Sequence, residues 1–187
     1  VLLLIFSFAL AAFSLLFKGV KNINYLSFSV AFPSIMFAIT PLLIALASLI
    51  LSPFEKANNK RYVEKAKRKL IAQPNLIRIA ITGSYGKTTI KEMLATILSE
   101  KFSVLATPAS FNTPLGIAKT VEKLSDETQI FIAEAGARRK SDIKELCEII
   151  DPDIAVITGI ASQHIETFGS LDEIKNTKAE LLESKNV

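Results

Sequence analysis

The stretch Thr82-Gly83-Ser84-Tyr85-Gly86-Lys87-Thr88-Thr89 decides the fold, because it joins a short apolar run to an amphipathic one. Residues 76–81 before it are rich in β-branched side chains and predict a strand. Residues 88–101 after it predict a helix with one face formed by Ile90, Leu94, Ile97 and Leu98. Glycines between a strand and a helix let backbone N–H groups turn toward a phosphate, and the helix N-terminus adds partial positive charge. The stretch therefore predicts a nucleotide-phosphate site.

Single residues of this loop have expected roles. Lys87 would neutralise the β- and γ-phosphates, and the hydroxyl of Thr88 would ligate Mg²⁺. A plain strand-to-helix turn is the alternative, but Gly-Lys-Thr between a clear strand and a clear helix favours the phosphate loop. The expected nucleotide-binding residues are Gly83, Ser84, Tyr85, Gly86, Lys87, Thr88 and Thr89.

Strands and helices alternate after this loop. Further strands are predicted at 102–106, 129–133 and 153–159. Further helices are predicted at 115–124, 141–150 and 171–182. We expect Ser141 to cap the second of these helices, and Ser170 or Asp172 to cap the third. This order of apolar strands and helices predicts an α/β fold, a P-loop parallel sheet flanked by helices, with ligands at the carboxyl ends of the strands.

Charge is distributed unevenly along the 187 residues. Residues 1–54 contain no Asp or Glu and only two basic residues, whereas all 18 acids follow residue 54. The net charge of +4 is too small for a nucleic-acid module driven by charge, and half of the residues are apolar, which excludes intrinsic disorder. A single cysteine, Cys147, excludes an internal disulfide framework and a multi-cysteine metal site, and its place in a helix assigns it to the core.

The apolar residues 1–54 predict a membrane segment of two transmembrane helices. Residues 1–17 carry no charge, and a second span is expected at 33–51, with Pro33 near its start and Pro41 kinking it. A cleaved signal peptide and a buried hydrophobic hairpin are the alternatives.

Seven basic residues between positions 55 and 70 predict a basic juxtamembrane helix or linker, 55–74, on the cytoplasmic side. Residues 75–187 are then the ATP-binding domain. The chain begins without Met, so we expect it to be a piece of a longer protein.

The short loop with its double threonine resembles the central ATPase domain of the Mur ligase family, the ATP-dependent amide ligases of cell-wall precursor synthesis. Three further stretches carry the resemblance: Ser-Phe-Asn-Thr-Pro-Leu-Gly at 110–116, Phe-Ile-Ala-Glu-Ala-Gly at 131–136, and a segment from 157 to 180 that contains His-Ile-Glu-Thr-Phe-Gly-Ser and Lys-Ala-Glu. Within the family they are most similar to the branch that adds D-alanyl-D-alanine to a UDP-N-acetylmuramoyl-tripeptide. The membrane segment stands where family members carry the domain that holds the uridine diphosphate.

The resemblance implies a catalytic set of Lys87, Glu134, His164 and Lys178. Glu134 would hold Mg²⁺ with Thr88, and His164 would help to bind a second Mg²⁺. Lys178 would be carbamylated by CO₂ and so become a metal ligand; an exposed helical lysine is the alternative. Asn112 and Thr113 would contact the substrate or the γ-phosphate, although a simple turn explains them nearly as well.

The implied reaction activates a substrate carboxylate as an acyl phosphate, which an amine then displaces. We expect a monomeric ligase at the bacterial cell membrane with its catalytic domain in the cytoplasm, acting on a nucleotide-sugar peptide and a dipeptide or amino acid, and no nucleic acid. The alternatives are a membrane-anchored poly-amino-acid synthetase of the same superfamily, a membrane-attached P-loop switch or transport ATPase, and a scaffold that only binds nucleotide.

Overall fold

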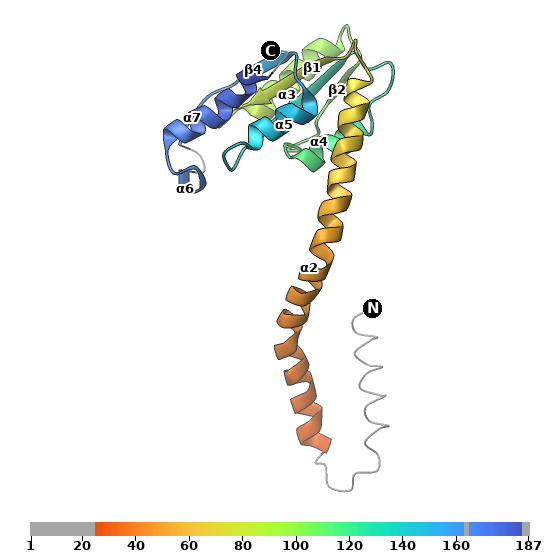
Figure 1. Ribbon diagram of the computed structural model, residues 1–187, viewed down its shortest axis with the longest axis vertical. Coiled ribbons are helices and arrows are strands. Elements are labelled where there is room, and N and C mark those ends of the chain that lie inside the picture. Colours follow the sequence, from red (N-terminus) through yellow and green to blue (C-terminus); the bar gives the residue numbers. More distant parts are fainter. Residues whose placement is uncertain (1–24, 163–164, 185–187) are drawn as a thin grey trace. The chain divides into compact units, whose positions relative to one another are not determined.

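The computed structural model describes residues 25–162 and 165–184 of the chain, and it divides the chain into two units, Val1–Phe54 and Glu55–Val187. The sheet and its helices belong to the second unit (Figure 1). The predicted span at 1–17 lies outside the described residues.

Helix α2, Tyr25–Ile71, is continuous for 47 residues and contains Pro33, Pro41 and Pro53. Among the described residues, one helical segment is long and apolar enough to cross a membrane: Pro33–Ile71 of α2. Its most apolar 18 residues have a mean hydropathy of 2.4. None of those 18 residues is buried. The length and hydropathy fit a membrane span, which stays a prediction.

The described helix differs from the two predicted segments. It is described from Tyr25, so Pro33 lies inside it, and the basic residues 55–70 continue the same helix. The predicted division after residue 54 coincides with the boundary between the two units. The change from apolar to charged side chains alters the preferred surroundings of the side chains and does not by itself end a helix. Each interior proline removes one backbone N–H donor, although its φ near −65° is helical.

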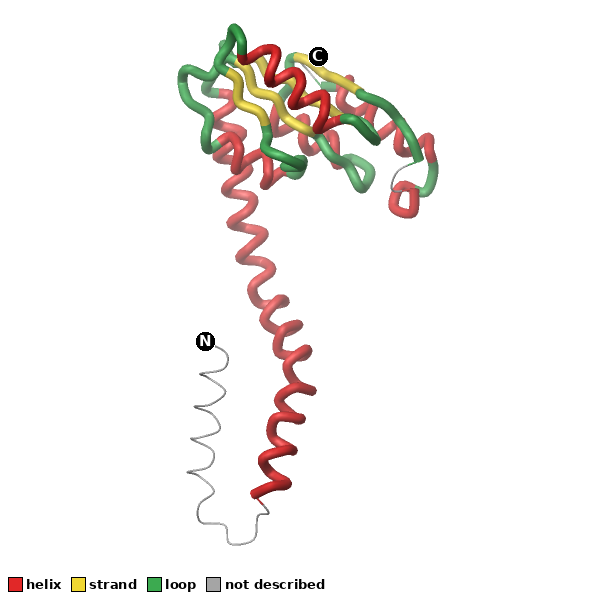
Figure 2. Tube along the Cα trace, turned by 180° about the vertical axis from the view of Figure 1, so that it is seen from behind, coloured by secondary structure: helices red, strands yellow, loops and turns green. Residues whose placement is uncertain are grey.

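The predicted parallel sheet is confirmed. Its four strands are β1 (Ile77–Thr82), β2 (Val104–Ala106), β3 (Ile130–Glu134) and β4 (Ile154–Ile157), in the spatial order β2-β3-β1-β4. All three strand pairs are parallel. Figure 2 shows the strands side by side with helices around them. The strands are parallel because each crossover helix returns the chain to the end of the sheet at which the previous strand began.

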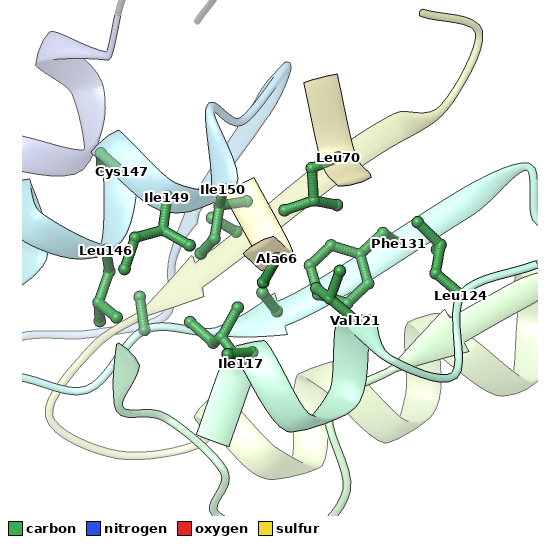
Figure 3. Close-up of a cluster of buried hydrophobic side chains, with 14 of the residues drawn as sticks. Ala66, Leu70, Ile117, Val121, Leu124, Phe131, Leu146, Cys147, Ile149 and Ile150 are labelled. Carbon is green, nitrogen blue, oxygen red and sulfur yellow. The ribbon is translucent and has the colours of Figure 1, made fainter. Parts of the chain in front are cut away.

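Helices cover both faces of the sheet. On one face, Ile79, Ile81, Ile130 and Ile132 pack against α3 (Lys87–Ser99). On the other, Ala80, Phe131 and Ala133 pack against α4 (Pro114–Val121), α5 (Asp142–Ile150) and the last turns of α2. Figure 3 shows Phe131 and Ile150 in this second cluster, which also contains the buried Cys147, as predicted. Alternation along each strand produces the two clusters, since neighbouring side chains point to opposite faces.

Three short elements follow β4: α6 (Ile165–Phe168), α7 (Leu171–Ala179) and the 3₁₀-helix η1 (Glu180–Glu183). Ser170 caps α7, as predicted, by accepting a hydrogen bond from the Glu173 N–H. The predicted Ser141 cap is wrong: Ser141 has a left-handed backbone and its side chain makes no capping bond. Asp142 instead accepts from the N–H groups of Arg138 and Arg139 and fixes the turn before α5.

The predicted apolar face of α3 is wrong at one position. Ile97 is 65% exposed, whereas Lys91 is only 1% exposed. At 100° per residue, the buried face is centred near Leu94 and Leu98, which brings position 91 inside and leaves position 97 at the edge.

The order of the strands creates a crevice between the carboxyl ends of β1 and β3. The chain leaves β1 toward α3 on one face and leaves β3 toward α5 on the other. Ligands of open α/β sheets bind at such a point of divergence.

Candidate functional site

The loop 83–86 after β1 is held by residues that follow β4. The Ser84 N–H donates to the Gly159 carbonyl at 2.7 Å, and the Ser84 hydroxyl exchanges hydrogen bonds with the backbone of Ala161. Gly86 has a φ of 75°, a left-handed conformation that favours glycine. Ser84 therefore uses its donors to shape the loop, whereas the backbone of Gly86 turns the chain into α3.

The N-terminus of α3 is open for a ligand. No side chain caps it, and its first turn contains no acidic residue. Lys87 begins the helix, and its Nζ atom donates to the Gly83 carbonyl at 2.8 Å. A helix N-terminus presents N–H groups with partial positive charge, and here a lysine adds a full charge at the same place.

Glu134 is the last residue of β3 and is 2% exposed. It pairs in register with Ile81, so its carboxylate lies beside the start of the phosphate loop. Its Oε2 atom accepts from the Thr88 hydroxyl at 2.8 Å, and its Oε1 atom accepts from the Asn112 amide at 3.1 Å. The structure thus brings together three of the predicted site residues, Glu134, Thr88 and Asn112.

The loop after β2 places Asn112 at this carboxylate. Thr107 accepts from the Glu134 N–H at 3.1 Å, and the Gly136 N–H donates to the Asn112 carbonyl at 3.2 Å. A Cβ atom on Gly136 would lie 2.7 Å from Asn112 Cγ, so only glycine allows this approach. The Thr113 hydroxyl accepts from the Gly116 N–H and caps α4, and its predicted contact with substrate stays a prediction.

Lys91 is a residue of this cluster that the sequence analysis missed. It is 1% exposed, its Nζ atom lies 3.5 Å from Glu134 Oε2, and it also donates to the Ala109 carbonyl. One signal could have found it: Lys91 follows Thr88 by three residues, and residues three apart lie on the same side of a helix.

Lys178 of α7 lies on a cleft of about 580 Å³ whose lining also includes Lys87, Asn112 and Glu134. It is 5% exposed, and its side chain forms no hydrogen bond or ion pair within residues 25–162 and 165–184. Burial, together with the nearby positive charge of Lys87, lowers the pKa of Lys178 from 10.5 to about 8. The alternative of an exposed helical lysine is wrong.

Arg138 and Arg139, also missed by the sequence analysis, line the same cleft.

The oxygen atoms of Thr88 and Glu134 fit a magnesium ion. Mg²⁺ commonly takes one or two protein oxygens and completes its octahedron with phosphates and water, so a hydroxyl and a carboxylate 2.8 Å apart suffice. No group of three His, Cys, Asp or Glu side chains that could hold a metal occurs in the described part of the chain. His164, the predicted ligand of a second ion, lies outside the described residues.

Comparison with known proteins gives one family. The profile described as "Mur ligase middle domain" matches residues 81–187, more than half of the chain. The UDP-N-acetylmuramoyl-tripeptide–D-alanyl-D-alanine ligase of Rickettsia prowazekii is 42% identical over 110 residues, which are 58% of this chain and 24% of that protein. The ligase of the same name from Treponema pallidum is 37% identical over 108 residues, which are also 58% of this chain and 24% of that protein.

Solved structures agree with these matches. MurF from Acinetobacter baumannii superposes with a TM-score of 0.65 at 32% identity, over 67% of this chain and 28% of that chain. MurF ligase from Thermotoga maritima, in complex with ADP, superposes with a TM-score of 0.62 at 36% identity, over 66% of this chain and 29% of that chain. This chain spans about a quarter of the length of the relatives that it matches in sequence. The resemblance carried by the loop 83–89 and the segments after β2 and β3 is confirmed.

Proposed function

Because this chain belongs to the Mur ligase family, we propose that it is the ATP-binding part of a ligase that adds D-alanyl-D-alanine to a UDP-N-acetylmuramoyl-tripeptide. The family consists of ATP-dependent amide ligases, and the two curated relatives described above carry out the finer reaction according to their names. The observation that carries the proposal is the hydrogen bond between Thr88 and Glu134 at the crevice between β1 and β3, with Lys87 beside it.

The phosphate loop would hold the triphosphate of ATP. We expect Lys87 to exchange its contact with the Gly83 carbonyl for the β- and γ-phosphates, because a phosphate is the stronger acceptor for an ammonium group. The first-turn amides of α3 would bind the same phosphates. Electrostatic stabilisation and positioning provide most of the acceleration in phosphoryl transfer.

Thr88 and Glu134 would hold the magnesium ion of the nucleotide. A bound Mg²⁺ neutralises charge that develops on the phosphates. Asn112 keeps one carboxylate oxygen of Glu134 occupied, which leaves Oε2 on the side of Thr88. Its amide would reach the γ-phosphate or the acceptor carboxylate if it rotated away from Glu134.

Lys178 would be carbamylated, as the family resemblance implies. CO₂ reacts with the neutral amine, and a pKa of about 8 leaves about 10% of Lys178 neutral at pH 7, against about 0.03% at a pKa of 10.5. Its burial without a partner in the described residues supports the same proposal, because a carbamate would replace an unfavourably buried cation with a metal ligand. His164 and this carbamate would hold the second Mg²⁺.

The amide bond would form in two steps. The acceptor carboxylate attacks the γ-phosphorus and displaces ADP, and the amine of the second substrate then attacks the resulting acyl phosphate and displaces inorganic phosphate. The proton lost by the amine passes to solvent or a nearby base. Lys87, Arg138 and Arg139 supply positive charge around the cleft in which these anions would meet.

The apolar part of α2 would anchor the protein in the bacterial cell membrane, with the sheet on the cytoplasmic side. Pro33–Ile71 has the required length and hydropathy, and the basic residues at 55–70 follow the apolar stretch directly. Protease added outside intact cells should leave the residues after 54 uncut, and their digestion would refute this orientation.

The ligase proposal is tested by measuring ADP release from the full-length protein. Release over many turnovers is expected to require the UDP-linked tripeptide and D-alanyl-D-alanine together, because the tripeptide alone can form the acyl phosphate only once. Sustained release without either substrate would indicate a switch or transport ATPase, and nucleotide binding without release would indicate a scaffold. Release with glutamate in place of the dipeptide would indicate a poly-amino-acid synthetase.

A further inference from the structure

Lys91 lies in the interior of the protein, where its charge must be compensated. It is 1% exposed, and the apolar residues around it on α3 include Ile90 and Leu94. An ammonium group in such surroundings is unfavourable unless it has acceptors. It has two acceptors, and they come from two different strand ends: Glu134 Oε2 at the end of β3 and the Ala109 carbonyl after β2.

The acceptor at Ala109 belongs to a sterically strained turn. Ala109 has a φ of 43°, a left-handed conformation that the Cβ atom of alanine disfavours. Such a turn persists only when its surroundings hold it. Asn112 follows three residues later, and its amide reaches the same carboxylate as Lys91. The contact of Lys91 with Ala109 therefore fixes the start of the segment that presents Asn112.

Glu134 is held from three sides. Thr88 and Lys91, one helical turn apart on α3, both approach Oε2, whereas Asn112 occupies Oε1. Without Lys91 the carboxylate would be buried with neutral donors only, and the loop after β2 would lose its tie to α3. Lys91 thus connects the metal-side carboxylate with the loop that carries the candidate substrate contact.

We propose that Lys91 is a positioning residue: through its Nζ atom it holds the 107–113 loop in its left-handed turn and places Asn112 and Glu134 together at the ATP site. The importance of this placement for catalysis rests on the proposed function, whereas the tie between the loop and α3 does not. Lys91 itself would touch neither ATP nor the acceptor.

The test uses the full-length protein and two measurements on Lys91→Met, a substitution of similar length without charge. Hydrogen exchange at the amides of residues 109–113 should become at least about tenfold faster, because a charge-assisted hydrogen bond is lost. In turnover, the KM values for the UDP-linked tripeptide and for ATP should each rise at least about fivefold, because Asn112 and Glu134 both lose their placement at the ATP site. Lys101→Met, an exposed lysine just after the same helix, is the matched control and should change neither.

A second variant keeps the test decisive if Lys91→Met does not fold. The double variant Lys91→Met/Glu134→Gln removes both buried charges, and its exchange at 109–113 is compared with that of Glu134→Gln alone. The proposal requires the same increase of about tenfold in this pair. Equal hydrogen exchange at residues 109–113 in the double and the single variant would overturn the proposal. An equal increase in exchange over the whole sheet would also overturn it. Faster exchange at residues 109–113 in Lys91→Met, together with no ligase turnover in the wild-type protein, would support the tie and refute the proposed function separately.

Discussion

The carboxyl edge of the sheet and the apolar part of α2 depart from the usual distribution of residues in opposite directions. At the edge, Glu134, Lys91 and Lys178 are charged side chains that are at most 5% exposed. In α2, Phe37 is 84% exposed and Leu49 is 75% exposed. Buried charge and exposed large apolar surface are the informative exceptions in a folded protein, and both are typical of binding surfaces.

The two departures differ in how specific they are. Glu134 and Lys91 have defined partners, such as the Thr88 hydroxyl 2.8 Å from the Glu134 carboxylate, and this geometry matches one class of ligand. The apolar surface of α2 has no such geometry and matches any hydrocarbon environment. The first region therefore predicts a chemical reaction, and the second predicts only a location.

The largest expected effect comes from removing charge at the edge. Lys87→Ala and Glu134→Ala in the full-length protein should each lower substrate-dependent ADP release on the order of 10³-fold, because each removes electrostatic stabilisation of the phosphates or the metal. Lys101→Ala, which removes an exposed lysine, should keep the wild-type rate. Turnover above a tenth of the wild-type rate in either site variant would remove the roles proposed for Lys87 and Glu134.

A charge introduced into α2 tests the other region. Leu43→Lys places a cation in the middle of the apolar stretch and should weaken membrane insertion by about 3 kcal/mol, or about 100-fold in partitioning. Ile71→Lys makes the same kind of change at an exposed position near the end of the same helix and should have no effect. The measurement is the fraction of protein that sediments with membranes after carbonate extraction. Equal sedimentation of all three proteins would contradict the anchor.

The buried charge of Lys178 makes stability depend on pH. Its folded pKa of about 8 lies below the unfolded value of 10.5, so the unfolded state binds more protons between these values. The free energy of unfolding should rise with pH from about 8 to 10.5 by up to about 3 kcal/mol, and the destabilisation should be complete below pH 8. In urea unfolding without CO₂, Lys178→Met should be more stable than the wild type at pH 7 and lose this advantage by pH 10.5. If the difference in the free energy of unfolding between the two proteins does not change with pH, Lys178 titrates normally.

The smallest effect concerns the support of Lys178. Ser170→Ala removes the cap of α7 and should cost about 1 kcal/mol, with hydrogen exchange about fivefold faster at residues 171–174. Ser110→Ala, at a serine whose side chain makes no hydrogen bond within the described residues, is the control. Unchanged exchange in the capped turn would mean that packing alone holds this end of α7.

Local sequence predicted most of the sheet and the phosphate loop, because apolar strands and the sequence Gly-Lys-Thr-Thr report on neighbouring residues in the chain. It did not predict Lys91, whose partners Glu134 and Ala109 come from other strand ends and meet it only in the folded sheet. It also placed a helix boundary near residue 54, since composition changes there although the backbone of α2 continues. Ser141 was a good cap by residue type, but its backbone is left-handed, and the distant Glu180 carboxylate instead accepts from the N–H groups of Ser141 and Lys144.

The central claim is that the edge formed by the ends of β1 and β3 binds ATP and magnesium. The most direct measurement is a crystal structure of the full-length protein with Mg²⁺ and a non-hydrolysable ATP analogue. We predict β- and γ-phosphates on the amides of residues 83–89 and on Lys87, with a metal ion bound to oxygen atoms of Thr88 and Glu134. A nucleotide bound elsewhere, or a metal ion that touches neither of these two residues, would contradict the account.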